Sequence, residues 1–139
     1  MRITLESDYA LRILGALATH EDRVDAKTLS EEISVTQRFT LKILHKLVQS
    51  EFVKSYKGVR GGYKLNVSPD KITLRAIIEL IDGPIIISRC LEHGEGCTLN
   101  PDKTSCIYHH IFESISFDVA KKLEGITIGD VLSKKYSLN

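Results

Sequence analysis

The sequence predicts a mainly α-helical chain with one small β-hairpin. Two observations carry this prediction. Apolar residues recur at helical spacing over most of the chain, and one glycine-broken stretch, near residues 52–67, changes to an alternating pattern. The 139 residues, 42% hydrophobic and 27% charged, suffice for one domain with a core and an extension.

Three helices are expected in the first third of the chain. The first covers about 7–20, with Ser7 as its expected N-cap, and a short one follows over about 26–33. Thr36 is expected to cap a third helix, in "TQRFTLKILHKLVQSEF". The apolar face of this third helix consists of Phe39, Ile43, Leu44, Leu47 and Val48. Two helices separated by only a few residues are typical of a helix-turn-helix.

The third helix lies in a basic part of the sequence. Residues 36–70 carry seven basic side chains against two acidic ones, although the net charge of the chain is only +1. Such a local excess suits a polyanion partner. A basic, hydrogen-bonding helix face that points away from the core fits the major groove of double-stranded DNA. The residues expected to contact bases or phosphates are Thr36, Gln37, Arg38 and Lys42.

A β-hairpin is predicted directly after this helix. Its strands are expected around 52–53 and 63–67, joined by a glycine-rich tip. Lys57 and Arg60 in the tip can reach phosphates or a minor groove, and Gly61 lets the backbone approach a phosphate closely. A hairpin in this position is the wing of a winged helix-turn-helix.

The rest of the chain is expected to form three further helices. One lies in "ITLRAIIELIDGP" and stops at Gly83-Pro84. A long amphipathic helix follows over about 105–123, and Thr127 is expected to cap a short closing helix. The long helix carries an apolar stripe, which consists of Ile107, Ile111, Ile115 and Val119. From its pattern alone, this stripe can pack on its own domain or on another chain.

These elements divide the chain into three regions. They are a winged helix-turn-helix over 1–82, a cysteine-rich segment over 83–104, and the long and closing helices over 105–139. The N-terminus has no uninterrupted apolar run, so neither a signal peptide nor a membrane span is expected, and the protein is predicted to be cytoplasmic. We find no phosphate loop, paired carboxylates or cofactor fingerprint, and therefore expect no enzyme activity.

All three cysteines of the chain, Cys90, Cys97 and Cys106, lie close together. Cytoplasmic thiols stay reduced, and an odd number of cysteines argues against a disulfide framework. The gaps of six and eight residues lack the Cys-x-x-Cys knuckles of structural zinc sites. Spacing alone therefore favours an iron–sulfur cluster over zinc only modestly, and a metal-free thiol redox switch also remains open.

The stretches "SDYALRIL" and "LKILHKLVQSEFVKSYKGVRGGYKL", together with the three-cysteine segment, resemble the Rrf-type family of bacterial winged-helix regulators. The best known members are the IscR-like and NsrR-like iron–sulfur sensors. The resemblance implies a homodimer, paired through the long helix with Ile107, Ile111, Ile115 and Val119 at its interface. It also implies a repressor of a partly palindromic operator, controlled by a cluster that senses nitric oxide, redox state or iron supply. The alternatives are a thiol switch and a zinc-stabilised regulator.

The resemblance also offers two candidates for a fourth, non-cysteine ligand. His109 follows Cys106 at the Cys-x-x-His spacing of IscR-like members, in which a histidine completes a 2Fe–2S site. Asp8 lies where NsrR-like members carry an aspartate that reaches the 4Fe–4S cluster of the partner subunit. The uneven cysteine gaps depart from the tighter IscR-like spacing. We therefore prefer Asp8 with a 4Fe–4S cluster over His109 with a 2Fe–2S cluster, and His93 and His110 are weaker candidates.

Overall fold

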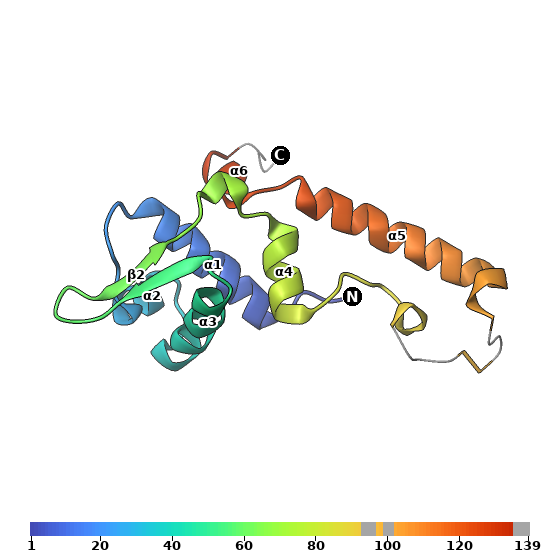
Figure 1. Cartoon of the computed structure of the whole chain (residues 1–139), viewed down its shortest axis with the longest axis horizontal. Helices are drawn as coiled ribbons and strands as arrows, with labels where there is room; N and C mark the ends of the chain where they lie inside the picture. The colour runs from blue at the N-terminus through green and yellow to red at the C-terminus, as the bar shows by residue number, and fades with distance from the viewer. Residues whose placement is uncertain (93–96, 99–101, 135–139) are drawn as a thin grey trace.

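The structure, a computed structural model, describes residues 1–92, 97–98 and 102–134. Its α-helices are α1 (Leu5–Thr19), α2 (Ala26–Glu32), α3 (Gln37–Gln49), α4 (Leu74–Asp82), α5 (Ile107–Glu124) and α6 (Ile128–Leu132). Its strands are β1 (Val53–Tyr56) and β2 (Gly62–Leu65), and its short 3-10 helices are η1 (Pro69–Lys71), η2 (Arg89–Leu91) and η3 (Lys103–Ser105). The predicted mainly helical fold with one hairpin is confirmed (Figure 1).

Side-chain oxygens cap the N-termini of most of these helices. The predicted caps Thr36 of α3 and Thr127 of α6 are confirmed, because each hydroxyl accepts a backbone N–H three residues later. The predicted cap Ser7 is wrong. α1 begins earlier, since Thr4 accepts the N–H of Ser7, and Ser7 itself is fully buried in the first turn. Apolar spacing identifies the helix, but the nearest suitable hydroxyl decides where it begins.

The N-terminal core is formed where α1, α2 and α3 pack together. Its fully buried members include Ala10, Ile13, Leu14, Leu29, Ile43, Leu44 and Leu47. The expectation that Phe39 joins this core is wrong, because its side chain is 48% exposed and meets the Tyr9 ring edge-on. Thr40 is buried in its place, which is possible because its hydroxyl donates to the carbonyl oxygen of Thr36.

The hairpin is antiparallel and pairs Val53 with Leu65 and Tyr56 with Gly62. It differs from the predicted strands at its ends, because β1 continues to Tyr56 and β2 ends at Leu65. The segment between α1 and α2 pairs with the outer edge of β2 through an isolated bridge. The N–H of Val24 donates to the carbonyl of Tyr63, and the N–H of Tyr63 donates to the carbonyl of Val24. The wing is therefore anchored along one edge to the helical core.

The C-terminal end of the chain returns to the N-terminal core. The N–H of Ile128 donates to Ile72 and the N–H of Leu74 donates to Ile126, so the residues before α4 and before α6 lie side by side. Ile128 is buried within the same cluster as the side chains of α1. α4 and α6, which precede and follow α5 in the chain, are thus both connected to the N-terminal core.

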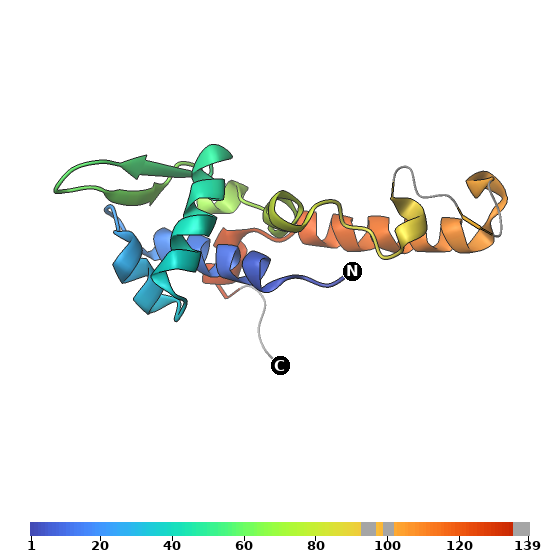
Figure 2. The same ribbon diagram turned by 90° about the horizontal axis from the view of Figure 1, so that it is seen from below.

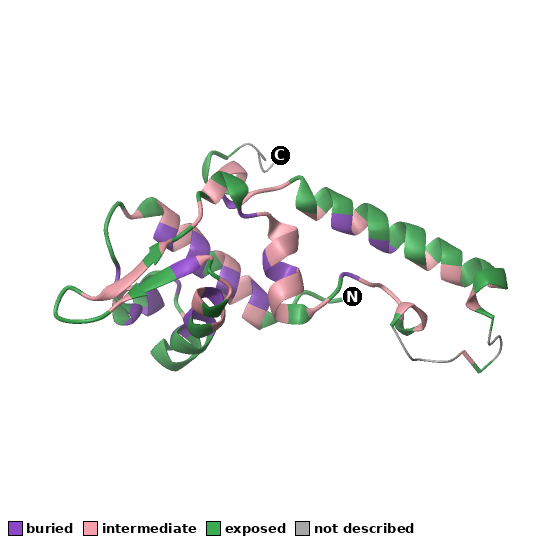
Figure 3. Cartoon of the chain, in the orientation of Figure 1, coloured by how far each residue is buried: buried purple, intermediate pink, exposed green. Residues whose placement is uncertain are grey.

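Between these connections α5 extends away from the core, and the molecule is elongated (Figures 1 and 2). A small cluster of Ile78, Ile85 and Ala120 packs α5 against α4 and the segment that follows it. Most of the remaining α5 surface is exposed (Figure 3). In the part of the chain that the structure describes, we find no helix with the length and apolar content needed to cross a membrane.

Candidate DNA-binding surface and cysteine segment

α2 and α3 meet through a tight turn in which Ser34 has a φ of +56°. This turn leaves one side of α3 in solvent while its other side packs against α1 and α2. The four predicted DNA contacts at this helix, Thr36, Gln37, Arg38 and Lys42, are all exposed. The start of α3 therefore presents a hydrogen-bonding, basic surface of the kind that enters a major groove.

Lys42 differs from the other three because its ammonium group has an acidic neighbour in the same chain. Its Nζ lies 3.3 Å from Oε1 of Glu6, and Nζ of Lys46 lies 2.9 Å from the same oxygen. Glu6 belongs to the first turn of α1, more than thirty residues away in sequence, so periodicity within α3 does not reveal this contact.

The tip of the wing is open to solvent. Lys57, Val59 and Arg60 are exposed, and the turn is closed by a bond from the N–H of Gly61 to the carbonyl of Gly58. Gly58 has a φ of +95°, a conformation that residues with a side chain rarely adopt. At Gly61, a β-carbon would lie 2.6 Å from the carbonyl oxygen of Tyr56. The glycines thus serve the shape of the tip, and the basic side chains remain free to face a phosphate.

Arg23 supports the wing in a way that the sequence did not predict. Its guanidinium lies over the ring of Tyr56, 3.6 Å from the centroid, and its Nη1 donates to the carbonyl of Arg60 at 3.3 Å. Such a cation–π contact contributes roughly 0.5–1 kcal/mol at an exposed site. The basic residue and the aromatic ring are separated by more than thirty residues, and no local pattern connects them.

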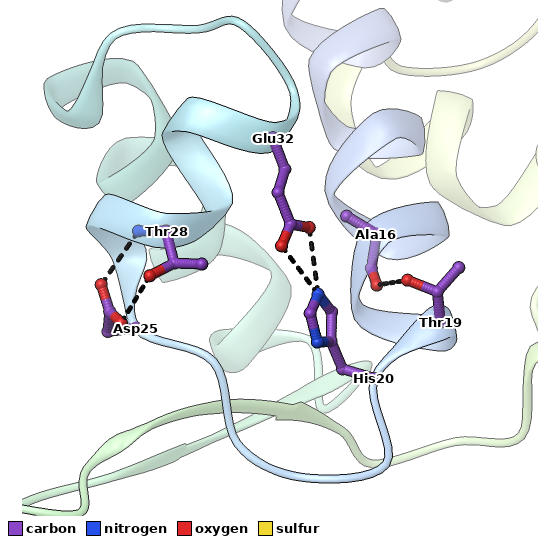
Figure 4. A network of polar contacts seen from close by, with 6 residues as sticks. All are labelled: Ala16, Thr19, His20, Asp25, Thr28 and Glu32. Carbon is purple, nitrogen blue, oxygen red and sulfur yellow. Dashed lines mark hydrogen bonds and ion pairs between the residues drawn. The ribbon is translucent and has the colours of Figure 1, made fainter.

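The segment that carries Arg23 is itself fixed by polar contacts at both of its ends (Figure 4). Nε2 of His20 lies 2.9 and 3.0 Å from the two carboxylate oxygens of Glu32, which joins the end of α1 to the end of α2. Asp25 accepts both the N–H and the hydroxyl of Thr28, and these bonds hold its pKa below the ordinary value. The loop therefore enters the edge of the hairpin in a defined position.

The cysteine segment runs along α5. The N–H of Ile87 donates to the hydroxyl of Ser116 at 3.1 Å, and this buried hydroxyl in turn donates to the carbonyl of Phe112. Further on, the segment forms η2, which contacts α5 and contains Cys90. Cys106 lies directly before the first residue of α5. The structure thus places Cys90 on an element that packs against α5 and Cys106 at the N-cap of the same helix.

The three thiols are partly exposed, and none forms a disulfide. Within residues 1–92, 97–98 and 102–134, no three histidine, cysteine or acidic side chains converge as a metal site would require. His93 lies outside the described residues. The donor types fit an iron–sulfur cluster, although the described residues of one chain do not bring three donors together at one point.

The two candidates for the fourth ligand differ in their surroundings. Asp8 forms an ion pair with Arg12, at 2.6 Å, on α1. α1 and the N-terminal end of α5 lie well apart in both views (Figures 1 and 2). His109 is one turn along α5 from Cys106, and its Nδ1 is buried without a hydrogen-bond partner in the described chain. A buried nitrogen without a partner is costly, so the Nδ1 of His109, three residues after Cys106, is a candidate to bind a metal ion.

The apolar stripe of α5 is divided between two surroundings. Ile107, Ile111 and Ile115 are exposed, at 70%, 46% and 43% respectively. Val119 instead packs against the cluster that joins α5 to α4. The reason is geometric, because each step of four residues rotates a side chain by about 40° around a helix. The first three members thus form an uncovered apolar strip, and the fourth turns toward its own chain.

A helix-turn-helix with an exposed basic recognition surface, followed by a basic wing, defines a winged-helix DNA-binding protein. The sequence profile of the Rrf2 family, described as an iron-dependent transcriptional regulator, matches residues 3–134. The chain belongs to this family. It is therefore a DNA-binding transcriptional regulator and not an enzyme.

Individual relatives agree with this assignment. A regulator of the HTH type from Aquifex aeolicus is 34% identical over 126 residues, which cover 90% of this chain and 87% of the relative. The regulator IscR of Aliivibrio salmonicida is 28% identical, with 95% of this chain and 77% of IscR covered. Among solved structures, CymR, the global cysteine regulator of B. subtilis, has a TM-score of 0.75 at 27% identity, covering 96% of this chain and 97% of CymR.

The close packing of the wing against the segment before α2 yields a prediction about two glycines. A β-carbon at Gly62 would lie 2.8 Å from the carbonyl oxygen of Val24, and the φ of Gly62 is +145°. We expect Gly62→Ala to lower the free energy of unfolding by about 1–3 kcal/mol, measured by urea denaturation.

Gly15 in α1 is the matched control, because a β-carbon there meets nothing within 4 Å. Gly15→Ala should raise the free energy of unfolding by about 0.5–1 kcal/mol, since alanine favours the helix interior. Equal effects of the two substitutions would contradict the close contact between the wing and Val24.

Proposed function

We propose that this regulator is a homodimeric repressor whose operator binding is controlled by an iron–sulfur cluster held by Cys90, Cys97 and Cys106. The observation that carries the proposal is the position of the cysteine segment. It leaves the DNA-binding core at the end of α4 and packs along α5, the helix with the uncovered apolar strip. Cysteines, proposed dimer helix and DNA-binding core therefore share one connected set of contacts.

In the proposed complex, α3 lies in the major groove and the wing contacts the adjacent backbone or minor groove. Arg38 and Gln37 are exposed at the start of α3 and can bond to base edges, as the first residues of recognition helices do. Lys57 and Arg60 in the wing face phosphates, and Gly61 keeps the tip backbone compact. Two copies would place two such surfaces on a partly palindromic operator.

The proposed dimer uses the uncovered strip of α5. An exposed row of three isoleucines one turn apart is unusual for a surface in water and suits the same row on a second copy. Val119 already packs against the cluster of Ile78, Ile85 and Ala120 in its own chain. It would therefore support the strip from behind and not contact the second copy directly.

For the proposed cluster, the chain supplies three thiolates and a weaker fourth ligand. When bound, such a cluster offers one corner that exchanges more readily than a thiolate-held corner and so can respond to a small signalling molecule. We prefer Asp8 of the partner subunit with a 4Fe–4S cluster, because the cysteine gaps are uneven. The partner subunit would supply it, since α1 lies well apart from the N-terminal end of α5 of its own chain. His109 with a 2Fe–2S cluster is the second candidate, and its buried, unpaired Nδ1 favours it.

Control of DNA binding would follow from the junction between α4 and the cysteine segment. Ile85 of this segment packs with Ile78 of α4 and Ala120 of α5. A change in the ligation of the cysteines would therefore alter how α5 sits on α4 and, in a dimer, how the two winged domains are oriented.

A metal-free thiol switch is the alternative function. It is favoured by the partial exposure of three thiols that form no disulfide and by the similarity to CymR, a cysteine regulator by its name. An anaerobically purified cluster protein is brown, whereas a thiol switch or a zinc protein is colourless.

DNA binding should respond differently to changes in the wing and in the helix. Lys57→Ala or Arg60→Ala should weaken binding to operator and random duplexes alike and reduce the salt slope by about 1 for each lost phosphate contact. Arg38→Ala should instead reduce discrimination between the two duplexes, by about 1–3 kcal/mol. Fluorescence anisotropy over a range of salt concentrations measures both effects, and wing variants with unchanged affinity and slope would disprove the wing assignment.

The dimer should depend on the uncovered strip. Replacing both Ile111 and Ile115 with glutamate would place unpaired charge in the proposed interface, so sedimentation should show folded monomers. Phe117→Glu is the matched control, because Phe117 is also exposed, at 65%, but lies on a different side of α5. A stable dimer of the double variant, or a monomer of the control, would move the interface elsewhere.

The ligands of the proposed cluster can be separated by substitution. Serine at Cys90, Cys97 or Cys106 should abolish stable assembly on anaerobic reconstitution, followed by absorption and Mössbauer spectra. Asp8→Ala should give a labile or spectrally altered cluster, and His109→Ala should change little. The opposite pattern would assign His109 and a 2Fe–2S site. His110→Ala is the control, since its Nε2 already bonds the carbonyl of Thr104, and colourless protein with stoichiometric zinc would refute the cluster.

A further inference from the structure

A buried carboxylate oxygen of α1 lies between two basic side chains of the recognition helix. Oε1 of Glu6 is shielded from solvent, and the ammonium groups of Lys46 and Lys42 lie 2.9 and 3.3 Å from it. A shielded anionic oxygen needs opposite charge, and these two lysines provide it.

The backbone at Glu6 is held in place by the start of its own helix. Thr4 caps α1, and its N–H and hydroxyl both donate to the carboxylate of Asp82 at the end of α4. Ser7, the next residue after Glu6, is fully buried. The first turn of α1 is thus fixed against both α3 and α4. The backbone of Glu6 is therefore already in place for its side chain to reach the lysines of α3.

Lys42 is at the same time a residue of the proposed DNA-binding surface. It lies one turn after Arg38 on the exposed side of α3, and 56% of its side chain is in solvent. Lys46 follows one turn later, with 36% of its side chain exposed. Both ammonium groups are directed back to α1, where they meet the same carboxylate oxygen of Glu6.

A lysine that is already paired contributes less to DNA binding than a free one. Binding to a phosphate then exchanges one anionic partner for another, and a paired lysine releases fewer counterions from the DNA than a free lysine does. The carboxylate also stays beside the interface, where it reduces the positive potential that attracts the backbone. Two lysines and one glutamate together present a net charge of +1 at this place, where the lysines alone would present +2.

We infer that Glu6 acts as an internal competitor of DNA phosphates for Lys42 and Lys46 and thereby lowers the general, sequence-independent affinity for DNA. The inference rests on the proposed placement of α3 in the major groove. As a consequence, base-reading residues such as Arg38 account for a larger share of the binding free energy. The ratio of operator affinity to random-DNA affinity is therefore higher than it would be if both lysines were unpaired. Glu6 is in this sense a specificity-determining residue that does not read a base.

The test measures binding of the full-length protein to a short random-sequence duplex by fluorescence anisotropy at several salt concentrations. Glu6→Gln keeps the size of the side chain and removes its charge. We expect it to raise the affinity for random DNA roughly fivefold at low salt and to steepen the salt slope by about 1, the value for one additional net positive charge. Unchanged or weaker binding would overturn the inference and would indicate that Glu6 positions Lys42 for DNA.

Two further comparisons make the result specific to this contact. Glu31→Gln removes an exposed carboxylate from neighbouring α2, and an equal rise in affinity for this control would overturn the inference. Lys42→Met should cost more affinity in the Glu6→Gln background than in the wild type, because the lysine is released there. Additive effects of the two substitutions would equally refute the competition.

Failure of this inference is distinguishable from failure of the proposed DNA surface. If Arg38→Ala and Arg60→Ala weaken binding while Glu6→Gln leaves it unchanged, only the competition is wrong. If none of the three changes binding, the proposed surface is wrong. Should thermal unfolding show that Glu6→Gln does not fold, Glu6→Asp keeps the charge but withdraws it by one methylene and should raise the affinity to a smaller extent.

Discussion

The burial of α1 among the other elements is the constraint on which the rest of the structure depends. α1 packs against α3 and α4 and also contacts α2, β2 and α6. Ile13 and Leu14 are fully enclosed, and burying such a side chain contributes roughly 1.5–3 kcal/mol. Because α3 and the wing both pack against this helix, the proposed DNA-binding surface is built on one packed core. The cap at Thr4 extends the constraint to the end of α4, where the cysteine segment begins.

Fewer buried side chains join this packed core to α5 than form the core itself. The junction consists mainly of the cluster around Ile78, Ile85 and Ala120 and of the bond between Ile87 and the buried hydroxyl of Ser116. A junction of few buried side chains is easier to rearrange than a full core. For the proposed function, this difference is an advantage, since the ligation state of the cysteines has to change the orientation of α5 without unfolding the winged domain.

The charges on α3 are balanced by the rest of the fold. Net charge near zero for the whole chain coexists with a basic surface on the recognition helix and wing. Part of that surface is paired internally, through Glu6, and part is open, through Arg38 and the wing tip. Electrostatic attraction alone does not distinguish DNA sequences, so a regulator gains selectivity when its general attraction is moderate.

The sequence by itself determined the local structure. Helical spacing, the hydroxyl caps at Thr36 and Thr127 and the glycine-rich hairpin tip act between near neighbours, and each of them was predicted correctly. The exposure of the predicted DNA contacts followed as well, because it depends only on which side of α3 is apolar.

Only the tertiary structure decided how distant segments meet. Examples are the pairing of Val24 with Tyr63, the support of the wing by Arg23 and the contact of Lys42 with Glu6. It also decided that Thr40 is buried where Phe39 was expected. The physical reason is common to all of them. Periodicity shows which face of an element is apolar. Which other element covers that face, and which charged side chain lies beside it, depend on how the whole chain packs.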